Sequence, residues 1–316
     1  MLVFKGLEPP APSSRLSAVA IGNFDGFHLG HREIISRLKE EAAGDGLERV
    51  VLTFDPHPER ALGKRSVRMI DTMEQRLESL EAADVDRTVI IPFDSSFARL
   101  SPSDFVSEVL ASGLGAKVVV VGGNFRFGKD RRGTIDRLAR LGRKHGIRVC
   151  PVAPLVLKGR TVSSSLIRGL LERGRVEEAA LFLGRPYEIR GRVVRGMAKG
   201  RQLGFPTANL DAANEITPDG VFVSDAVLDG ETFPSVTVIG AAPSVRPKGG
   251  GKLVETHIFD FERDLRGSAL AVRLLRKIRP VRRFKSEAGL VERIRLDIAE
   301  AKSYFMEGAV RRRPDA

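Results

Sequence analysis

The chain has 316 residues, 42% of them hydrophobic and 29% charged, and this composition excludes a disordered protein. Lys and Arg number 52 against 40 Asp and Glu, and the net charge of +12 favours anionic partners, which include nucleic acids, nucleotides and acidic lipids. The single cysteine, Cys150, excludes an intrachain disulfide. No apolar run approaches the ~18 residues of a membrane span, and no secretory signal is expected. We therefore expect a cytoplasmic protein of two domains, with no membrane or nucleic-acid partner.

In the first half of the chain, predicted strands and helices alternate. A short run rich in β-branched residues is followed each time by a segment with helical hydrophobic periodicity. The predicted strands are 16–22, 49–54, 87–93, 116–122 and 147–154, and the helices are 31–43, 72–83, 102–112 and 134–146. This alternation predicts a parallel sheet covered by helices. Two short helices follow, at 163–174 and 176–184.

From about residue 187 the segments become short, β-rich and separated by turns. The predicted strand segments are 187–196, 220–240, 252–261 and 269–278, and Asp229-Gly230 is typical of a hairpin turn. This pattern predicts a small antiparallel barrel. One amphipathic helix follows at 286–305, and we place the domain boundary at 185/186.

The run AIGNFDGFHLGHREII joins the first predicted strand to the first helix. It carries His28 and His31 among three glycines. Ligands bind at the carboxyl ends of parallel strands, and a helix N-terminus attracts phosphate. Nucleotidyl transfer moves negative charge onto the oxygen of departing pyrophosphate, so that hydrogen-bond donors suffice and no nucleophilic side chain is needed. The run therefore indicates a nucleotide site.

Other interpretations of this run are weaker. A metal site would need a third ligand beside His28 and His31, and none is nearby at helical spacing. The Gly-x-Gly-x-x-Gly fingerprint of dinucleotide binding is absent. The histidines could also only pack or cap, which for a lone histidine would be the preferred interpretation.

A second glycine-rich run, GRQLGFPTANL, begins at Gly200. It is not a Walker A motif. Thr207 and Asn209 are oxygen donors two residues apart, so in an extended segment they point to one side and could share a Mg²⁺ ion. Gly196 and Gly200 would supply a loop over phosphates. Ordinary turn chemistry explains the same residues equally well.

Several motifs together resemble one family. GNFDGFHLGH resembles the His-x-Gly-His element of the adenylyltransferase superfamily, and within it the bacterial bifunctional riboflavin kinase/FAD synthetase family. Further stretches are similar to that family in order: TFDPHP, GGNFRFGKDRRG, TVSSSLIRGLL, GRQLGFPTANL, PDGVFVSDAVLDG, PSVTVIGAAPSV and VETHIFDFERDLRG.

The resemblance implies a fold of class α/β plus β. A Rossmann-like nucleotidyltransferase domain with a parallel sheet, 1–185, would be the FMN adenylyltransferase (FAD synthetase). A small antiparallel β-barrel followed by a helix, 186–316, would be the riboflavin kinase. Riboflavin would be phosphorylated with Mg²⁺ and ATP to FMN. A second ATP would then adenylylate FMN to FAD and pyrophosphate, the FMN phosphate attacking the α-phosphorus directly.

For the first domain the resemblance implies three groups of residues. The catalytic group is His28, His31 and Arg168. The ATP-binding group is Gly22, Asn23, Phe24, Asp25, Gly30, Ser163 and Ser164. The flavin-binding group is Pro56, Pro58, Asn124 and Phe125. Two alternatives stay open, since Ser163 also suits an ordinary helix cap and the rings of Phe125 and Phe127 could stack on the flavin or simply pack.

For the second domain the resemblance implies that Thr207 and Asn209 bind Mg²⁺ and ATP, together with Gly200. Glu255 would be the base that takes the proton of the riboflavin 5′-hydroxyl. His257 shares the face of Glu255, and we assign it no role. The loop Met197-Ala198-Lys199 is atypical of the family, and its effect stays open.

Two rival hypotheses remain. One is an adenylyltransferase for another acceptor with a degenerate barrel, against which the intact Thr207, Asn209 and Glu255 set argues. The other is a flavin sensor whose basic surface contacts RNA, which would release no ADP from riboflavin and ATP. The sequence leaves open the oligomeric state, a homo-oligomer included, the rates, the passage of FMN between sites and any need for reduced flavin.

Overall fold

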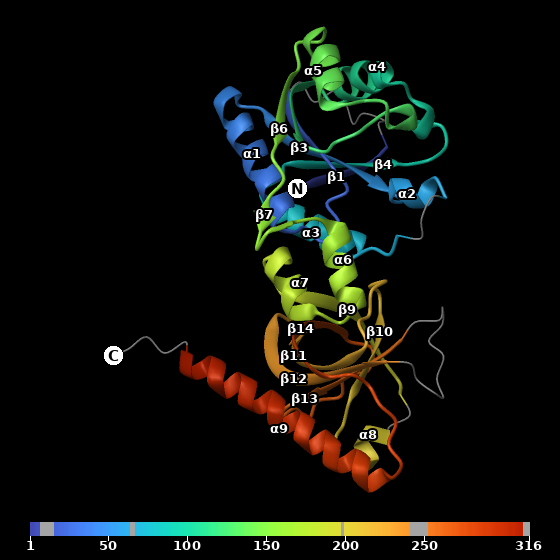
Figure 1. Ribbon diagram of the computed structural model, residues 1–316, viewed down its shortest axis with the longest axis vertical. Helices are drawn as coiled ribbons and strands as arrows, with labels where there is room; N and C mark the ends of the chain where they lie inside the picture. Colours follow the sequence, from blue (N-terminus) through green and yellow to red (C-terminus); the bar gives the residue numbers. More distant parts are fainter. Residues whose placement is uncertain (7–15, 64–66, 197–198, 241–251, 312–316) are drawn as a thin grey trace. The chain divides into compact units, whose positions relative to one another are not determined.

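The computed structural model describes residues 1–6, 16–63, 67–196, 199–240 and 252–311 (Figure 1). Met197 and Ala198 of the atypical loop therefore lie outside the described residues. The chain divides into two compact units, Met1–Ser164 and Ser165–Ala316. Among the described residues, no helix combines the length and apolar composition that crossing a bilayer requires.

The first unit contains a six-stranded sheet with the order β1-β4-β3-β2-β5-β6. Every neighbouring pair of strands is parallel, as the β-α alternation predicts. The strands are β1 (Leu2–Lys5), β2 (Ser17–Ile21), β3 (Glu48–Asp55), β4 (Arg87–Pro92), β5 (Ala116–Gly122) and β6 (Arg148–Val152). The central strand β2 is buried along its whole length, because helices cover both faces of the sheet.

The helices of the first unit lie on the two faces of this sheet (Figure 1). On one face, α1 and α3 pack through residues such as Ile35, Leu38 and Leu80. On the other, η2 and α5 pack through Phe105, Leu110 and Leu138. The helical segments are α1 (Leu29–Asp45), α2 (Pro58–Ala61), α3 (Met73–Glu81), η1 (Phe97–Arg99), α4 (Pro102–Asp104), the π-helical η2 (Phe105–Gly113), η3 (Lys129–Arg131) and α5 (Ile135–Arg143).

The strand order places a topological switch point between β2 and β5. After β2 the chain moves through β3 to β4, and it then crosses to the other side of β2 to form β5 and β6. Loops after two such strands diverge and leave a crevice at the carboxyl edge of the sheet. The glycine run that starts at Gly22 follows β2, and the segment from Gly123 follows β5. A short hairpin, β7 (Val156–Leu157) with β8 (Arg160–Thr161), comes later.

The second unit contains a closed antiparallel barrel with the order β10-β13-β12-β11-β14-β9. Its first helices are α6 (Ser164–Glu172) and α7 (Val176–Leu183), and α7 packs against β14 and β9. From Ser165 onward, both helices lie in the second unit. The strands are β9 (Tyr187–Val194), β10 (Ala208–Ala212), β11 (Gly220–Leu228), β12 (Glu231–Gly240), β13 (Leu253–Ile258) and β14 (Ala269–Arg279), and a short helix, α8 (Lys199–Gln202), precedes β10.

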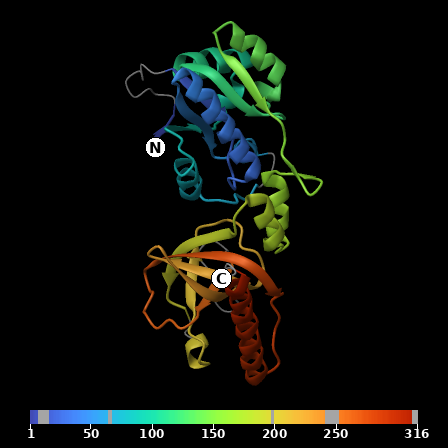
Figure 2. The ribbon, with the colours of Figure 1, turned by 90° about the vertical axis from the view of Figure 1, so that its left-hand side faces the viewer.

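The barrel has an interior partly built of hydroxyl groups. The Ser224 Oγ atom lies 2.7 Å from Thr237 Oγ1, which lies 2.9 Å from Thr256 Oγ1, and all three residues are fully buried. The turn between β11 and β12 is the predicted hairpin, with positive φ at Asp229 and Gly230. Outside the barrel, the predicted C-terminal helix α9 (Glu287–Arg311) packs along β11, β12 and β14 (Figure 2).

Candidate functional sites

The N-terminus of α1 brings the two predicted catalytic histidines together. His28 caps the helix, and its Nδ1 atom accepts a hydrogen bond from the His31 backbone N–H at 3.2 Å. The two rings stack with centroids 3.6 Å apart and planes 13° from parallel. A Cβ at Gly30 would approach the His28 ring at 3.3 Å, so the glycine leaves room for the ring beside the backbone. The imidazole rings of His28 and His31, which are close in sequence, therefore lie together as a stacked pair.

Burial keeps both imidazoles neutral. It lowers the pKa of His28 to about 4. The pKa of His31 is lowered well below its usual range, first by burial and second by the neighbouring His28. Because His28 Nδ1 accepts a hydrogen bond, its proton sits on Nε2, which is a donor. His31 Nδ1 is buried and has no hydrogen-bond partner among the described residues. The site therefore offers polar ring nitrogens without a formal charge.

The glycine loop before α1 is held by its own side chains. Phe24 is fully buried and packs against the His31 ring at 5.1 Å between centroids. The Asp25 carboxylate accepts hydrogen bonds from the backbone N–H groups of Ile70 at 2.9 Å and Asp71 at 3.2 Å. The side chains of Phe24 and Asp25 therefore shape the loop, and its backbone from Gly22 is the part that remains to meet a ligand.

The predicted serine motif lies against this loop. Ser164 Oγ donates to the backbone carbonyl of Asp25 at 2.9 Å, although the two residues are 139 positions apart in the sequence. A Cβ at Gly30 would lie 3.7 Å from the Val162 carbonyl. Ser163 directly precedes α6, and Arg168 lies on α6 in the second unit. The structure thus places the Ser164 side chain against the backbone of the glycine loop.

The predicted flavin-contacting residues follow strands of the same sheet. Pro56 follows β3 and Pro58 is the first residue of α2, whereas Asn124 and Phe125 follow β5. Because the carboxyl ends of parallel strands meet at one edge, these residues share the edge at which the glycine loop lies.

The two phenylalanines after β5 differ in their surroundings. Phe125 is half-buried and its ring stacks on Phe127, with centroids 5.7 Å apart. Phe127 is buried and contacts Phe105 at 5.2 Å between centroids. Phe127 therefore packs in the core, and Phe125 is the more exposed ring of the pair.

A third histidine, His57, joins the site without having been predicted. Its Nε2 atom lies 2.9 Å from Asn23 Nδ2, and its Nδ1 atom accepts from the Glu59 backbone N–H at 3.2 Å. Sequence reasoning took the TFDPHP run only through its prolines. The available signal was a further histidine directly after a strand that neighbours β2.

In the barrel, strand register places the predicted kinase residues on one face. Asn209 on β10 is the direct cross-strand partner of Glu255 on β13. Side chains of such a pair project from the same face with their Cβ atoms about 5 Å apart. Thr207 precedes Asn209 by two positions, just before β10 begins, and Gly200 packs against it, since a Cβ there would lie 3.1 Å from Thr207 Oγ1. The side-chain oxygen atoms of Thr207 and Asn209 and the carboxylate of Glu255 are therefore expected to lie close together on this face.

Two further features of this face concern its ionisable groups. Burial raises the pKa of the Glu255 carboxyl above its usual range. His257 Nδ1 lies 2.7 Å from the Pro206 carbonyl and must therefore carry the proton it donates. The His257 ring also contacts Phe205 edge-on, with centroids 6.2 Å apart. His257, to which the sequence assigned no role, thus holds the residues that lead into Thr207.

The donors on this face suit a hard cation. The described residues contain no cluster of three or more His, Cys, Asp or Glu that could hold a metal. Mg²⁺ takes few protein ligands and keeps several waters, and the Thr207 hydroxyl and the Asn209 amide offer the oxygen atoms it prefers. The donor set therefore fits Mg²⁺ held jointly with substrate phosphates.

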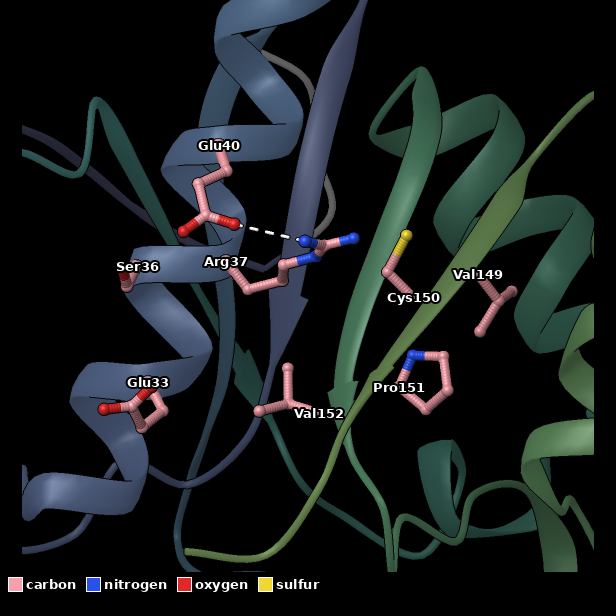
Figure 3. A pocket seen from close by; sticks show the side chains of 8 residues that line it. All are labelled: Glu33, Ser36, Arg37, Glu40, Val149, Cys150, Pro151 and Val152. Carbon is pink, nitrogen blue, oxygen red and sulfur yellow. Dashed lines mark hydrogen bonds and ion pairs between the residues drawn. The ribbon is translucent and has the colours of Figure 1, made fainter.

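A hollow of about 450 Å³ lies elsewhere in the first unit, between α1 and β6 (Figure 3). Glu33, Arg37 and Glu40 line it from α1, and Cys150 lines it from β6. Burial, followed by the adjacent Glu41, raises the pKa of the Cys150 thiol. No residue predicted for either site lines this hollow.

Comparisons with known families cover both units. The family described as FAD synthetase matches residues 11–166, and the family described as riboflavin kinase matches residues 183–305. The two matches fall in the order that the motifs predict.

Curated relatives match nearly the whole chain. The bifunctional riboflavin kinase/FMN adenylyltransferase of Bacillus subtilis is 35% identical over 92% of this chain and 92% of its own. The protein of the same name from Pseudomonas fluorescens is 34% identical over 98% of this chain and 100% of its own. A crystal structure titled macrolide-efflux protein, from Streptococcus pneumoniae, aligns with a TM-score of 0.85 at 29% identity, covering 96% of this chain and 99% of that one.

Proposed function

The chain belongs to the family of bifunctional riboflavin kinases/FMN adenylyltransferases, and from that premise we propose how its residues divide the two reactions. Residues 1–185 transfer AMP to FMN, and residues 186–316 phosphorylate riboflavin. One observation carries this division: the stacked His28 and His31 lie wholly in the first unit, and the Asn209–Glu255 pair lies wholly in the second.

In the adenylyl transfer, an oxygen of the FMN phosphate forms a bond to the α-phosphorus of ATP while the bond to pyrophosphate breaks. The buried histidines supply ring N–H groups to the charge that develops on the phosphorus oxygens. They do so as neutral imidazoles, because burial lowers their pKa values. Arg168 supplies the positive charge that neutral histidines lack.

The glycine loop and the serine motif hold ATP in this proposal. The loop backbone supplies N–H groups at the start of α1, where the helix dipole favours phosphate. The ATP-binding residues are Gly22, Asn23, Phe24, Asp25, Gly30, Ser163 and Ser164. The flavin rests against Pro56, Pro58, Asn124 and Phe125, at the carboxyl ends of β3 and β5.

In the kinase reaction, Glu255 accepts the proton of the riboflavin 5′-hydroxyl as that oxygen attacks the γ-phosphorus of ATP and ADP leaves. Its raised pKa suits a group that must take up a proton. Thr207 and Asn209 hold Mg²⁺, which when bound neutralises the phosphate charge. Gly200 lets the chain come close to the phosphates.

The proposal makes ATP, riboflavin and FMN the partners of the chain and places it in the cytoplasm, where a lone cysteine remains reduced.

Two matched variants test whether each reaction uses its own site. His31→Ala should abolish FAD formation from supplied FMN and leave ADP release from riboflavin unchanged. Glu255→Gln should strongly lower ADP release from riboflavin and leave FAD formation from supplied FMN unchanged. Both activities are measured on each purified full-length variant. Loss of both activities in a folded single variant would contradict two separate sites, and an active Glu255→Gln kinase would contradict the base.

A further inference from the structure

In the barrel, the strand pairing that holds the predicted kinase residues stops one position short of Thr207. The pairing of β10 with β13 begins at Ala208, which lies opposite Thr256. The same register, continued by one position, sets Thr207 opposite His257. Pro206, the residue before Thr207, has no N–H group with which to extend the ladder. A contact outside the ladder therefore has to fix the position of Thr207.

The His257 side chain makes such a contact. Its Nδ1 atom lies 2.7 Å from the carbonyl oxygen of Pro206. A carbonyl oxygen only accepts, so Nδ1 is the donor and carries a proton whether the ring is neutral or charged. This carbonyl belongs to the peptide group that joins Pro206 to Thr207. The hydrogen bond thus acts on the backbone directly before Thr207.

Ring contacts orient the His257 imidazole for this bond. The ring meets Phe205 with centroids 6.2 Å apart and planes at 87°, and it meets Phe259 with centroids 5.8 Å apart and planes at 62°. Phe205 is itself held, because its backbone N–H donates to the Gly200 carbonyl at 2.8 Å. His257 is half-buried among these residues. The packing therefore favours the ring position in which Nδ1 faces Pro206.

The orientation of this peptide group sets where the Thr207 hydroxyl lies. A peptide group is planar, so a rotation of the Pro206 carbonyl carries the Thr207 nitrogen and Cα with it. Asn209, in contrast, is held by ladder pairing opposite Glu255. Loss of the histidine hydrogen bond would therefore move Thr207 relative to Asn209 and leave the pair of Asn209 and Glu255 in place.

We propose that His257 is a positioning residue for the kinase reaction, which holds the Pro206 carbonyl and so keeps the Thr207 hydroxyl on the face of Asn209. The inference rests on the proposed function, in which Thr207 and Asn209 bind Mg²⁺ and ATP. His257 acts through the backbone before Thr207 and touches no reacting atom.

Two substitutions separate the hydrogen bond from the ring packing. His257→Leu keeps a bulky apolar side chain beside Phe205 and Phe259 and removes the donor. His257→Asn removes the ring and places an amide N–H group where Nδ1 lies. We expect His257→Leu to weaken the binding of Mg²⁺ and nucleotide, and His257→Asn to retain most of it.

Binding is measured at the barrel site itself, without turnover. Full-length protein labelled with nitrogen-15 is titrated with ADP and Mg²⁺, and the side-chain amide signal of Asn209, assigned through Asn209→Ala, reports binding there. His257→Leu should weaken this binding about fivefold, the usual effect of losing one hydrogen bond. Undiminished binding by His257→Leu, or a loss of the same size in His257→Asn, would overturn the positioning role.

Thr207→Val separates the positioning role from the metal assignment. Valine keeps the shape of threonine and lacks the hydroxyl, so this variant should itself weaken the binding of ADP and Mg²⁺. In the Thr207→Val background, His257→Leu should have no further effect, and additive losses would overturn the positioning role. Undiminished binding by Thr207→Val would overturn the metal assignment of Thr207 in the proposed function, and the part of His257 with it.

Kinase kinetics give a second measurement. His257→Leu should raise KM for ATP in the presence of Mg²⁺ about fivefold and leave KM for riboflavin unchanged. FMN adenylylation by the same chain should stay constant, which shows that the first unit is intact. A rise in KM for riboflavin in place of KM for ATP would contradict a role through Thr207.

A measurement on the unsubstituted protein covers the case in which His257→Leu fails to fold. Nitrogen-15 NMR of imidazole-labelled protein, with His257 assigned through His257→Asn, reports which ring nitrogen is protonated. We expect the proton on Nδ1 at alkaline pH. A proton on Nε2 alone would set two acceptors against each other at the Pro206 carbonyl and would overturn the proposal.

Discussion

In the barrel site, the positions of single side chains depend on glycines that let the backbone come close to them. The Asn209 side chain packs directly over Gly196, where an added Cβ would overlap its amide. Gly200 is constrained in the same way, since a Cβ there would lie 2.5 Å from the Phe205 carbonyl. The glycines that the sequence suggested as a loop over phosphates therefore also keep the predicted metal-binding side chains in place.

Gly196→Ala tests this dependence. The added methyl group must displace the Asn209 amide, so we expect riboflavin kinase kcat/KM to fall about tenfold or more, as for a lost hydrogen bond to a charged group. FMN adenylylation should be unchanged. Gly44→Ala, at a helical site where a Cβ meets nothing within 4 Å, is the matched control and should leave both activities intact. A fully active Gly196→Ala kinase would contradict the role of Asn209.

The pH dependence of the kinase tests Glu255. The proposed base acts as a carboxylate, so activity should rise with pH through the pKa of Glu255, which burial raises above its usual range. The rising limb of kcat/KM for riboflavin should therefore lie at higher pH than for an exposed glutamate. Glu255→Gln should lower the rate and remove this limb. The same limb in that variant would mean that another group titrates.

Sequence reasoning found the residues whose spacing carries their chemistry, such as His28 with His31 and Thr207 with Asn209. It did not predict His57 and assigned no role to His257, because each contacts a backbone or side-chain partner that is distant in sequence. Only strand pairing brings such partners together.

Among the elements, the start of α1 couples stability to the charge of the site. His28 caps the helix through Nδ1, which accepts a hydrogen bond only while it is unprotonated. Its pKa is lowered from 6.5 to about 4 in the folded protein. Between these values the unfolded chain binds a proton that the folded chain does not, so the cap stabilises α1 fully above about pH 6.5 and less as the pH falls towards 4.

His28→Asn tests this coupling. Asparagine is a good N-cap and does not titrate, so the variant should lose less α1 stability between pH 7.5 and 5 than the parent does. Some dependence of α1 stability on pH should persist in the variant, because His31 also has a lowered pKa. Amide hydrogen exchange of α1, corrected for the intrinsic rate at each pH, measures the loss. An unchanged dependence would show that His28 is not the coupled group.

The elements that the sequence predicted are those with strong patterns of their own, such as β5 with its four consecutive valines and the long α9. It did not predict β1, whose residues Leu2 and Val3 are exposed at a sheet edge and which exists through pairing with β4. Nor did it identify β10 as a barrel strand. β10 is five residues long and is defined by its neighbours β9 and β13.

At the scale of the whole molecule, the two proposed sites offer different side chains for phosphorus chemistry. The first offers neutral donors at a helix N-terminus, which suits charge spreading onto a leaving pyrophosphate. The second offers a carboxylate of raised pKa opposite an oxygen donor, which suits deprotonation of a hydroxyl. The fold class was predictable because the change from β-α alternation to short strands is visible in the sequence.

The central claim is that both reactions occur on this one chain and that the product of the barrel site is the substrate of the histidine site. The most direct test is a chromatographic time course of flavins from purified protein with riboflavin, ATP and Mg²⁺. FMN should appear first and FAD after it, with FMN reaching a maximum and then declining. FMN that accumulates without FAD, or riboflavin that stays unchanged while supplied FMN is converted to FAD, would contradict the account.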